Sequence, residues 1–230
     1  MRKDRYDASE LTEAQFQPGS RGRVLRNLLG ITLKRGMDRA EAVAQVQAFE
    51  EFSTLYGPDH RFSAADIREM HRIWLGGIYP WAGSERQVQM SKGGFTFAAV
   101  RHIPALMAEL EAGPLKRHTP CRFADRGQVI TALVEVHTEL LLIHPFRDGN
   151  GRLARMLAVL MGLQAGLPPL DFSFIKGKAR QYYFAAVRAG MDRDYRPMEQ
   201  VFGKVIGRTV LAYKKQGASS SKTSPRTKKV

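Results

Sequence analysis

The sequence has little cysteine, no long apolar run and few acidic residues, and each shortage excludes a class of protein. Cys121 is the single cysteine among 230 residues, so an intramolecular disulfide cannot form, and a reducing compartment such as the bacterial cytosol is expected. The most apolar stretch, residues 156–167, is broken by Gln164 and two glycines and is too short to cross a bilayer. The first residues are charged and polar, without the apolar segment of a signal peptide. We expect no membrane partner, while export as an effector by another route stays open.

Acidic residues number 22 against 36 Lys and Arg, which leaves a formal net charge of +14. Such an excess suits a nucleic acid, an anionic lipid or a polyphosphate. Residues 214–230 hold six basic residues, no acidic ones and several serines, a composition that predicts a disordered basic tail. The tail is either a solubilising end or an arm for nucleic acid, so nucleic acid is expected as a partner only through it.

Apolar residues make up 43% of the chain, which is enough to fill a core. In residues 1–213 they recur at three- and four-residue spacings, and alternation is scarce, so the sequence predicts an all-α fold. Ser63 followed by Asp66 resembles a capping box that begins one helix. The expected helices are one that ends at Leu55, one from Ser63 through Trp74, and others at 103–110, 129–140, 153–165, 178–189 and 198–213.

One segment, residues 86–98, departs from the helical pattern. Val88 and Met90 alternate on one side of a Lys92-Gly93-Gly94 turn, and aromatic residues alternate on the other. This arrangement is typical of a β-hairpin. A lone hairpin buries little of itself, so it either packs on a helix or presents an edge to another chain.

The loop between the fourth and fifth of the seven expected helices carries the clearest functional pattern. Pro145 ends the preceding helix, while Gly149 and Gly151 let the backbone turn tightly just before the next helix begins. Backbone amides and the positive end of the helix dipole then form an anion site that suits phosphate oxygens. Asn150 can add an amide donor to it.

Charged residues surround this turn. Arg152 and Arg155 are three residues apart and project from one helix face, where a shared anion such as a di- or triphosphate would offset their repulsion. Asp148 is placed to hold Mg²⁺ between phosphates. His144 at the other end of the loop can act as a general base on an incoming hydroxyl.

The string His144-Pro-Phe-Arg-Asp-Gly-Asn-Gly-Arg-Leu-Ala-Arg155 resembles the signature of the Fic (Fido-fold) family, and residues 144–155 match it without a departure. Less specifically, residues 78–83 resemble the segment before the family's flap, and residues 92–97 stand where its β-hairpin flap would be. The resemblance covers roughly residues 50–205. It implies a Fic/Fido helical bundle over 50–213, preceded by an N-terminal helical region over 1–49.

The resemblance also implies a transfer of AMP from ATP, with Mg²⁺, to a Tyr, Thr or Ser hydroxyl of a target protein or of the chain itself, releasing pyrophosphate. His144 would be the general base, Phe146 an apolar anchor, and Asp148 the metal ligand. Phosphates would be bound by Gly149, Asn150, Gly151, Arg152 and Arg155. The flap residues Lys92, Gly93, Gly94, Phe95, Thr96 and Phe97 would dock the target by main-chain pairing.

Several alternatives stay open. Gly151 stands where relatives that act as kinases carry Lys, which favours AMP over phosphoryl transfer, but transfer of phosphocholine or of another nucleotide would use the same loop. Tyr182 and Tyr183 either stack on adenine or pack in the core. A basic nucleic-acid-binding protein is the alternative of another class, and a toxin or effector held by an antitoxin-like partner is compatible with the enzyme.

Many Fic proteins carry an inhibitory helix with the pattern Ser/Thr, three residues, Glu, then Gly or Asn. Ser9 and Glu13 have its first and fifth positions, but Ala14 departs from the sixth. A short helix over residues 8–16 would then place Glu13 over Arg155 and block the γ-phosphate. The alternative is an ordinary N-terminal helix with a surface glutamate.

Overall fold

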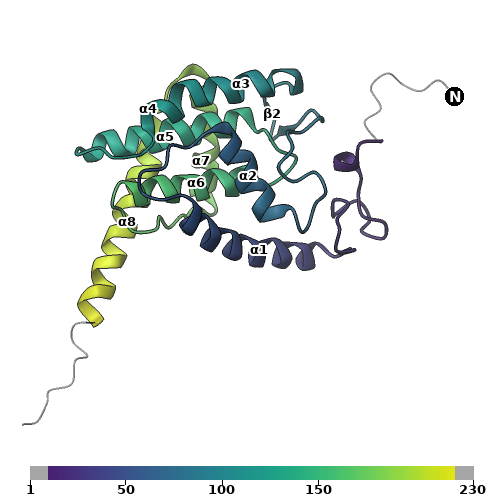
Figure 1. The fold of residues 1–230 in the computed structure, drawn as a ribbon, viewed down its shortest axis with the longest axis horizontal. Helices are drawn as coiled ribbons and strands as arrows, with labels where there is room; N and C mark the ends of the chain where they lie inside the picture. Colours follow the sequence, from purple (N-terminus) through teal and green to yellow (C-terminus); the bar gives the residue numbers. More distant parts are fainter. Residues whose placement is uncertain (1–9, 221–230) are drawn as a thin grey trace, which may run out of the picture.

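The computed structural model describes residues 10–220. They form a helical body with one small antiparallel hairpin (Figure 1), which confirms the predicted all-α fold with a β-hairpin. Among these residues no helix combines the length and apolar character needed to cross a bilayer. The elements are η1 Thr12–Ala14, α1 Lys34–Leu55, α2 Ala64–Leu75, β1 Ser91–Lys92, β2 Phe95–Thr96, η2 Val100–His102, α3 Ile103–Leu110, η3 Glu111–Leu115, α4 Lys116–His118, α5 Arg126–Ile143, α6 Asn150–Gln164, α7 Lys178–Ala189, η4 Gly190–Asp192 and α8 Arg196–Ser220.

Helices α5 and α6 form the centre of the molecule. In α5, eleven of eighteen residues are buried, on every side of the helix, as expected of a helix enclosed by others. Helices α3, α7 and α8 pack on α5, while α1 packs on α2 and α2 on α6 (Figure 1). The loop of residues 144–149 therefore leaves the most enclosed helix and enters the next, which gives the site a rigid support.

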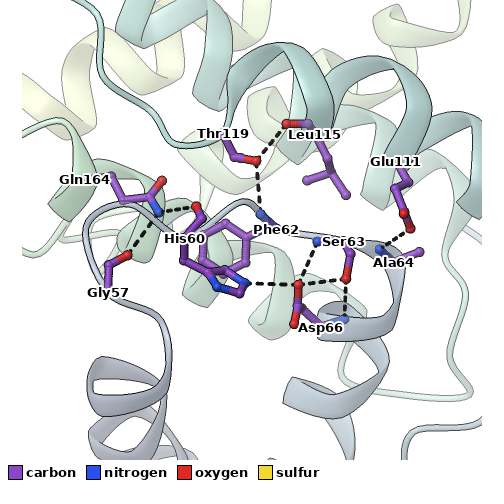
Figure 2. Close-up of polar contacts among 10 residues, drawn as sticks. All are labelled: Gly57, His60, Phe62, Ser63, Ala64, Asp66, Glu111, Leu115, Thr119 and Gln164. Atoms are coloured by element: carbon purple, nitrogen blue, oxygen red, sulfur yellow. Dashed lines mark hydrogen bonds and ion pairs between the residues drawn. The ribbon is translucent and has the colours of Figure 1, made fainter.

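The start of α2 is fastened by the predicted capping box, which the structure confirms. Ser63 Oγ accepts a hydrogen bond from the Asp66 amide, and the Asp66 carboxylate accepts from the Ser63 amide (Figure 2). The same region is tied to distant elements, since the Ala64 amide donates to Glu111 and Gln164 Nε2 donates to the His60 carbonyl. These bonds fix the helix whose later residues face the candidate site.

The chain before α2 differs from the prediction. Helix α1 ends at Leu55 as predicted and contains the expected domain boundary between residues 49 and 50, and the division into domains stays a prediction. The expected helix over residues 8–16 is a single 3₁₀ turn, Thr12–Ala14, and Ser9 lies outside the described residues. Isolated helices shorter than about 12 residues are marginal in water, and this segment has too few residues before Pro18 to grow longer.

The far end of the chain also differs. Helix α8 continues to Ser220, so the first residues of the expected basic tail extend a helix that is already formed, where each added residue costs little. Residues 221–230 lie outside the described residues, and the expectation of disorder there stays a prediction.

The hairpin is present at the predicted place and is shorter than predicted. Ser91 pairs with Thr96 and Lys92 with Phe95, around Gly93 and Gly94 at φ of +58° and +76°. Two consecutive residues with positive φ are what a tight two-residue hairpin turn requires. The hairpin therefore follows from its glycines more than from the strands they join.

Candidate active site

The loop of residues 144–149 takes its shape from two residues with left-handed backbone angles. His144 closes α5 at a φ of +52°, and its amide still donates to the Leu140 carbonyl. Gly149 caps α6 at a φ of +85°, and a Cβ at that position would lie 2.8 Å from the Trp74 ring. Both the backbone angle and the neighbouring ring therefore require glycine there.

The side chain of Asn150 bonds within the loop, which the sequence did not predict. It is 2% exposed, its Oδ1 accepts from the Phe146 amide at 2.9 Å, and its Nδ2 donates to the Phe146 carbonyl at 2.7 Å. The side chain thus closes the loop on itself instead of pointing an amide at a ligand. Phe146 is fully buried and stacks on the His71 ring at 3.9 Å, in agreement with an apolar anchor.

The imidazole of His144 is set up to accept a proton at Nε2. Its Nδ1 lies 3.2 Å from the Leu141 carbonyl, which can only accept, so Nδ1 carries the proton and Nε2 is the free base. Burial lowers the pKa of His144 to about 4, and the positive charges of Arg86 and Lys92 act in the same direction. The ring is therefore neutral at pH 7. Phe97 of the hairpin stacks on it at 3.7 Å.

The two arginines of α6 lie beside groups from other elements. Arg152 forms an ion pair with Glu41 of α1 and lies over the Trp74 ring. Arg155 faces the Tyr183 hydroxyl, and its positive charge opposes the rise that burial causes in the pKa of that hydroxyl. The same hydroxyl lies 2.6 Å from His137 Nε2. The Arg152 guanidinium is therefore oriented before any ligand arrives.

These groups line one cavity of about 1090 Å³. Its walls come from the loop and α6, from the hairpin, from α7 and from the start of α1. The cavity brings together the predicted residues His144, Asp148, Gly149, Gly151, Arg152, Arg155, Lys92, Gly93, Phe95 and Phe97. A space of this size is at the upper end of ligand pockets, and its wall carries several cations, so it suits a nucleotide phosphate chain together with part of a second substrate.

Asp148 is the residue available for a metal ion. Its side chain is half exposed, its Oδ1 accepts from the Gly149 amide at 2.6 Å, and it lies 3.6 Å from Arg152 Nη2. Residues 10–220 contain no cluster of three or more metal-ligating side chains. Mg²⁺ commonly takes one or two carboxylates and completes its shell with phosphate oxygens and water, and Asp148 fits that mode.

Glu13 lies elsewhere than predicted. Its Oε1 accepts from the Gln87 amide at 2.5 Å, its carbonyl accepts from Arg147 Nε at 2.8 Å, and it does not line the cavity that contains Arg155. The 3₁₀ turn of Thr12–Ala14 is too short to place its side chain over α6. Glu13 thus fastens the N-terminal segment to the base of the hairpin.

Arg86 was not singled out in the sequence, yet it connects the hairpin to the loop. Its side chain is 1% exposed and donates from Nε to the His144 carbonyl, from Nη1 to that of Val88 and from Nη2 to that of Ala98, each at 2.7 Å. No local pattern identifies such a residue, because its partners lie up to 58 positions away.

The structure also shows where the two tyrosines of α7 lie relative to the cavity. Tyr182 is 42% exposed, donates to Gln200 and does not line the cavity. Tyr183 lines the cavity but is 4% exposed, with its ring edge-on to His137. Stacking on adenine is therefore not available to Tyr182, and the Tyr183 hydroxyl is bonded to His137.

Comparison with known proteins finds a family and its fold. The family model described as Fic/DOC family matches residues 61–161. The chain is 32% identical over 166 residues to the protein adenylyltransferase fic-1 of Caenorhabditis briggsae, covering 72% of this chain and 31% of that one. The chain thus spans about a third of the length of this curated relative.

Solved structures agree with the fold. The BepC effector of Bartonella tribocorum, with bound AMPPNP, superposes at a TM-score of 0.69 and 23% identity, over 85% of this chain and 97% of that one. An N-terminal Fic domain of a Bartonella quintana effector, with bound ADP, gives 0.63 and 26% over 79% and 89%. The helical architecture and the hairpin are accordingly those of Fic domains.

Proposed function

Because the chain carries a domain of the Fic/DOC family over residues 61–161, we propose that it is a protein adenylyltransferase that moves AMP from ATP to a Tyr, Thr or Ser hydroxyl. The observation that supports the proposal is that a neutral His144 and the arginines Arg152 and Arg155 line one cavity. The relative from Caenorhabditis briggsae bears this name, and two structures of this fold, BepC and a Fic domain from Bartonella quintana, are described with bound AMPPNP and ADP.

The reaction assigned to this site is a displacement at the α-phosphorus of ATP. The acceptor hydroxyl oxygen forms a bond to that phosphorus, its proton passes to His144 Nε2, and the bond to the bridging oxygen breaks to release pyrophosphate. His144 is neutral at pH 7 and so needs no prior deprotonation. Arg152 and Arg155 offset the negative charge of the phosphates, and the amides at the start of α6 add donors.

Asp148 is the group that would hold Mg²⁺ in this site, where the ion would neutralise phosphate charge. The bond from the Gly149 amide to Asp148 Oδ1 fixes the carboxylate toward the cavity. This chain's contribution is therefore one pre-oriented carboxylate beside the phosphate-binding arginines.

The hairpin is the proposed dock for the target. Its residues Lys92, Gly93, Phe95 and Phe97 line the cavity beside His144, and β1 and β2 each have one edge without a strand partner within residues 10–220. A target segment added as a further strand would bring its hydroxyl next to the imidazole. The compartment in which this happens, the bacterial cytosol or a cell that receives an effector, stays a prediction.

Transfer of radiolabel tests the proposal. The chain incubated with Mg²⁺ and ATP labelled at the α-phosphate should label itself or proteins of a lysate, and His144→Ala should abolish the labelling. His102→Ala is the matched control, because His102 is exposed and outside the cavity. Label that enters protein from the γ-phosphate but not from the α-phosphate would identify a phosphotransferase instead and contradict the proposal.

A further inference from the structure

Glu41 of α1 is a buried acid in the wall of the cavity. It is 2% exposed and lies outside the residues that match the family model. Carboxylates are rarely buried this deeply unless their oxygens are paired, because the desolvation of an unpaired charge is costly. Its partners therefore indicate why it is there.

Both carboxylate oxygens of Glu41 are used. Oε2 accepts from Arg152 Nη1 at 2.5 Å, and Oε1 accepts from the Tyr79 hydroxyl at 2.6 Å. The Glu41 carbonyl accepts from Trp74 Nε1 at 3.0 Å, and the ring of that tryptophan lies 4.6 Å from the Arg152 guanidinium. Arg152 is thus held by an ion pair and by an aromatic face that the same glutamate helps to place.

The arrangement leaves part of Arg152 available. The arginine side chain is 28% exposed while that of Glu41 is 2% exposed, so the carboxylate lies deeper in the wall than the guanidinium. Only Nη1 is hydrogen-bonded to Glu41, and Nη2 lies 3.6 Å from Asp148. The remaining N–H groups can therefore meet phosphate oxygens without the ion pair breaking.

We infer that Glu41 is a positioning residue, which holds Arg152 in the orientation that binds the nucleotide phosphates. The inference rests on the proposed function, because that function names the phosphates as the ligand of Arg152. An arginine without this partner would lose its rotamer freedom each time a nucleotide bound, and its binding would weaken accordingly. A glutamate that instead withheld Arg152 from phosphate would give the opposite sign on removal.

Glu41→Gln tests the inference, because the amide keeps the size of the side chain and loses its charge. Titration calorimetry with a non-hydrolysable ATP analogue and Mg²⁺ should show a Kd about tenfold weaker than wild type, in line with losses after removal of a supporting side chain. In AMP transfer the same variant should raise the KM for ATP more than it lowers kcat. Glu50→Gln, an exposed residue of the same helix, should leave both values unchanged.

A double-mutant cycle separates positioning from a general structural role. If Glu41 acts through Arg152, the variant carrying both Glu41→Gln and Arg152→Ala should bind the analogue as weakly as Arg152→Ala alone. Tyr79→Phe removes only the hydroxyl that fixes Oε1 and should weaken binding in the same direction but by less, and it serves if Glu41→Gln does not fold.

Three results would overturn the inference: unchanged or tighter binding in a folded Glu41→Gln chain, losses that add up in the double variant, or no binding of the analogue by wild type. Binding by wild type without transfer of AMP would overturn the proposed function alone and leave the positioning role intact.

Discussion

Gly149 is the residue with the least room for change in the loop. A side chain there would have to adopt a φ of +85°, and its Cβ would lie 2.8 Å from the Trp74 ring. Trp74 itself is buried and supports Arg152. A side chain at position 149 would therefore strain the backbone of the loop and displace the ring that supports Arg152.

We expect Gly149→Ala to lower the free energy of unfolding by about 2 to 4 kcal/mol, from backbone strain and overpacking together, and to reduce AMP transfer at least as much as it reduces stability. Denaturant titration measures the first and label transfer the second. Gly203→Ala in α8 is the control, since nothing lies within 4 Å of its added Cβ and helix propensity favours alanine. Equal stability of the two variants would contradict the expectation.

Some residues of the site could be predicted from the local sequence and others could not. The loop residues are contiguous and precede a helix, so their spacing alone indicates an anion site. Glu41 and Arg86 lie outside this loop, and each acts through a partner far away in the chain. Nothing in the residues beside them indicates those partners, and the bonds from the Asn150 side chain to Phe146 were missed for the same reason.

Disruption of the hairpin should affect the two proposed substrates differently, the target protein more than the nucleotide. Its strands are two residues long and its turn depends on Gly93 and Gly94, both at positive φ. It contributes little to the core, because residues 91–94 are exposed. A broken turn should therefore affect docking of the target more than folding or binding of the nucleotide.

Gly94→Val should consequently leave the thermal unfolding temperature within a few degrees of wild type and the Kd for a non-hydrolysable ATP analogue nearly unchanged, while transfer of AMP to other proteins falls about tenfold or more as strand addition is lost. Gly30→Val is matched to it, since Gly30 also has a positive φ and open space around it and lies outside the cavity. A loss of nucleotide binding equal to the loss of transfer would show that the hairpin serves the nucleotide instead.

The helices were predictable because their apolar spacing matches the period of an α-helix, and the capping box at Ser63 gave one start correctly. Their ends were less so. The extension of α8 through Lys214 and Lys215 needs a helix already formed before it, and the N-terminal 3₁₀ turn needs contacts with the hairpin and with Arg147. Both depend on the rest of the fold, which short windows of sequence do not contain.

For the whole molecule, the buried His137 makes stability depend on pH. Burial lowers its pKa to about 3, whereas an unfolded histidine has a pKa of about 6.5. Between these values the unfolded chain binds more protons than the folded one, so stability rises with pH in this window and is lost as pH falls from about 6.5 toward 3.

Accordingly, the free energy of unfolding should fall between pH 6.5 and pH 4 by up to about 1.4 kcal/mol per pH unit for this one group. His137→Gln should be less stable at pH 7, because the bond to Tyr183 changes, but should show a shallower slope. Denaturant titrations at pH 7, 6, 5 and 4 compare the slopes, and equal slopes in the two chains would rule out this source of acid sensitivity.

The bonds that Arg86 makes affect which substitutions the hairpin can tolerate. All three of its bonding nitrogens are occupied by backbone carbonyls, which every amino acid possesses, and these carbonyls belong to both the hairpin and the loop. These bonds hold the base of the hairpin beside the loop whichever residues stand at the turn, while Phe97 adds a side-chain contact to the imidazole. If the hairpin docks the target as proposed, substitutions at Gly93 and Gly94 would change the surface offered to the target while Arg86 and Phe97 keep the imidazole in place.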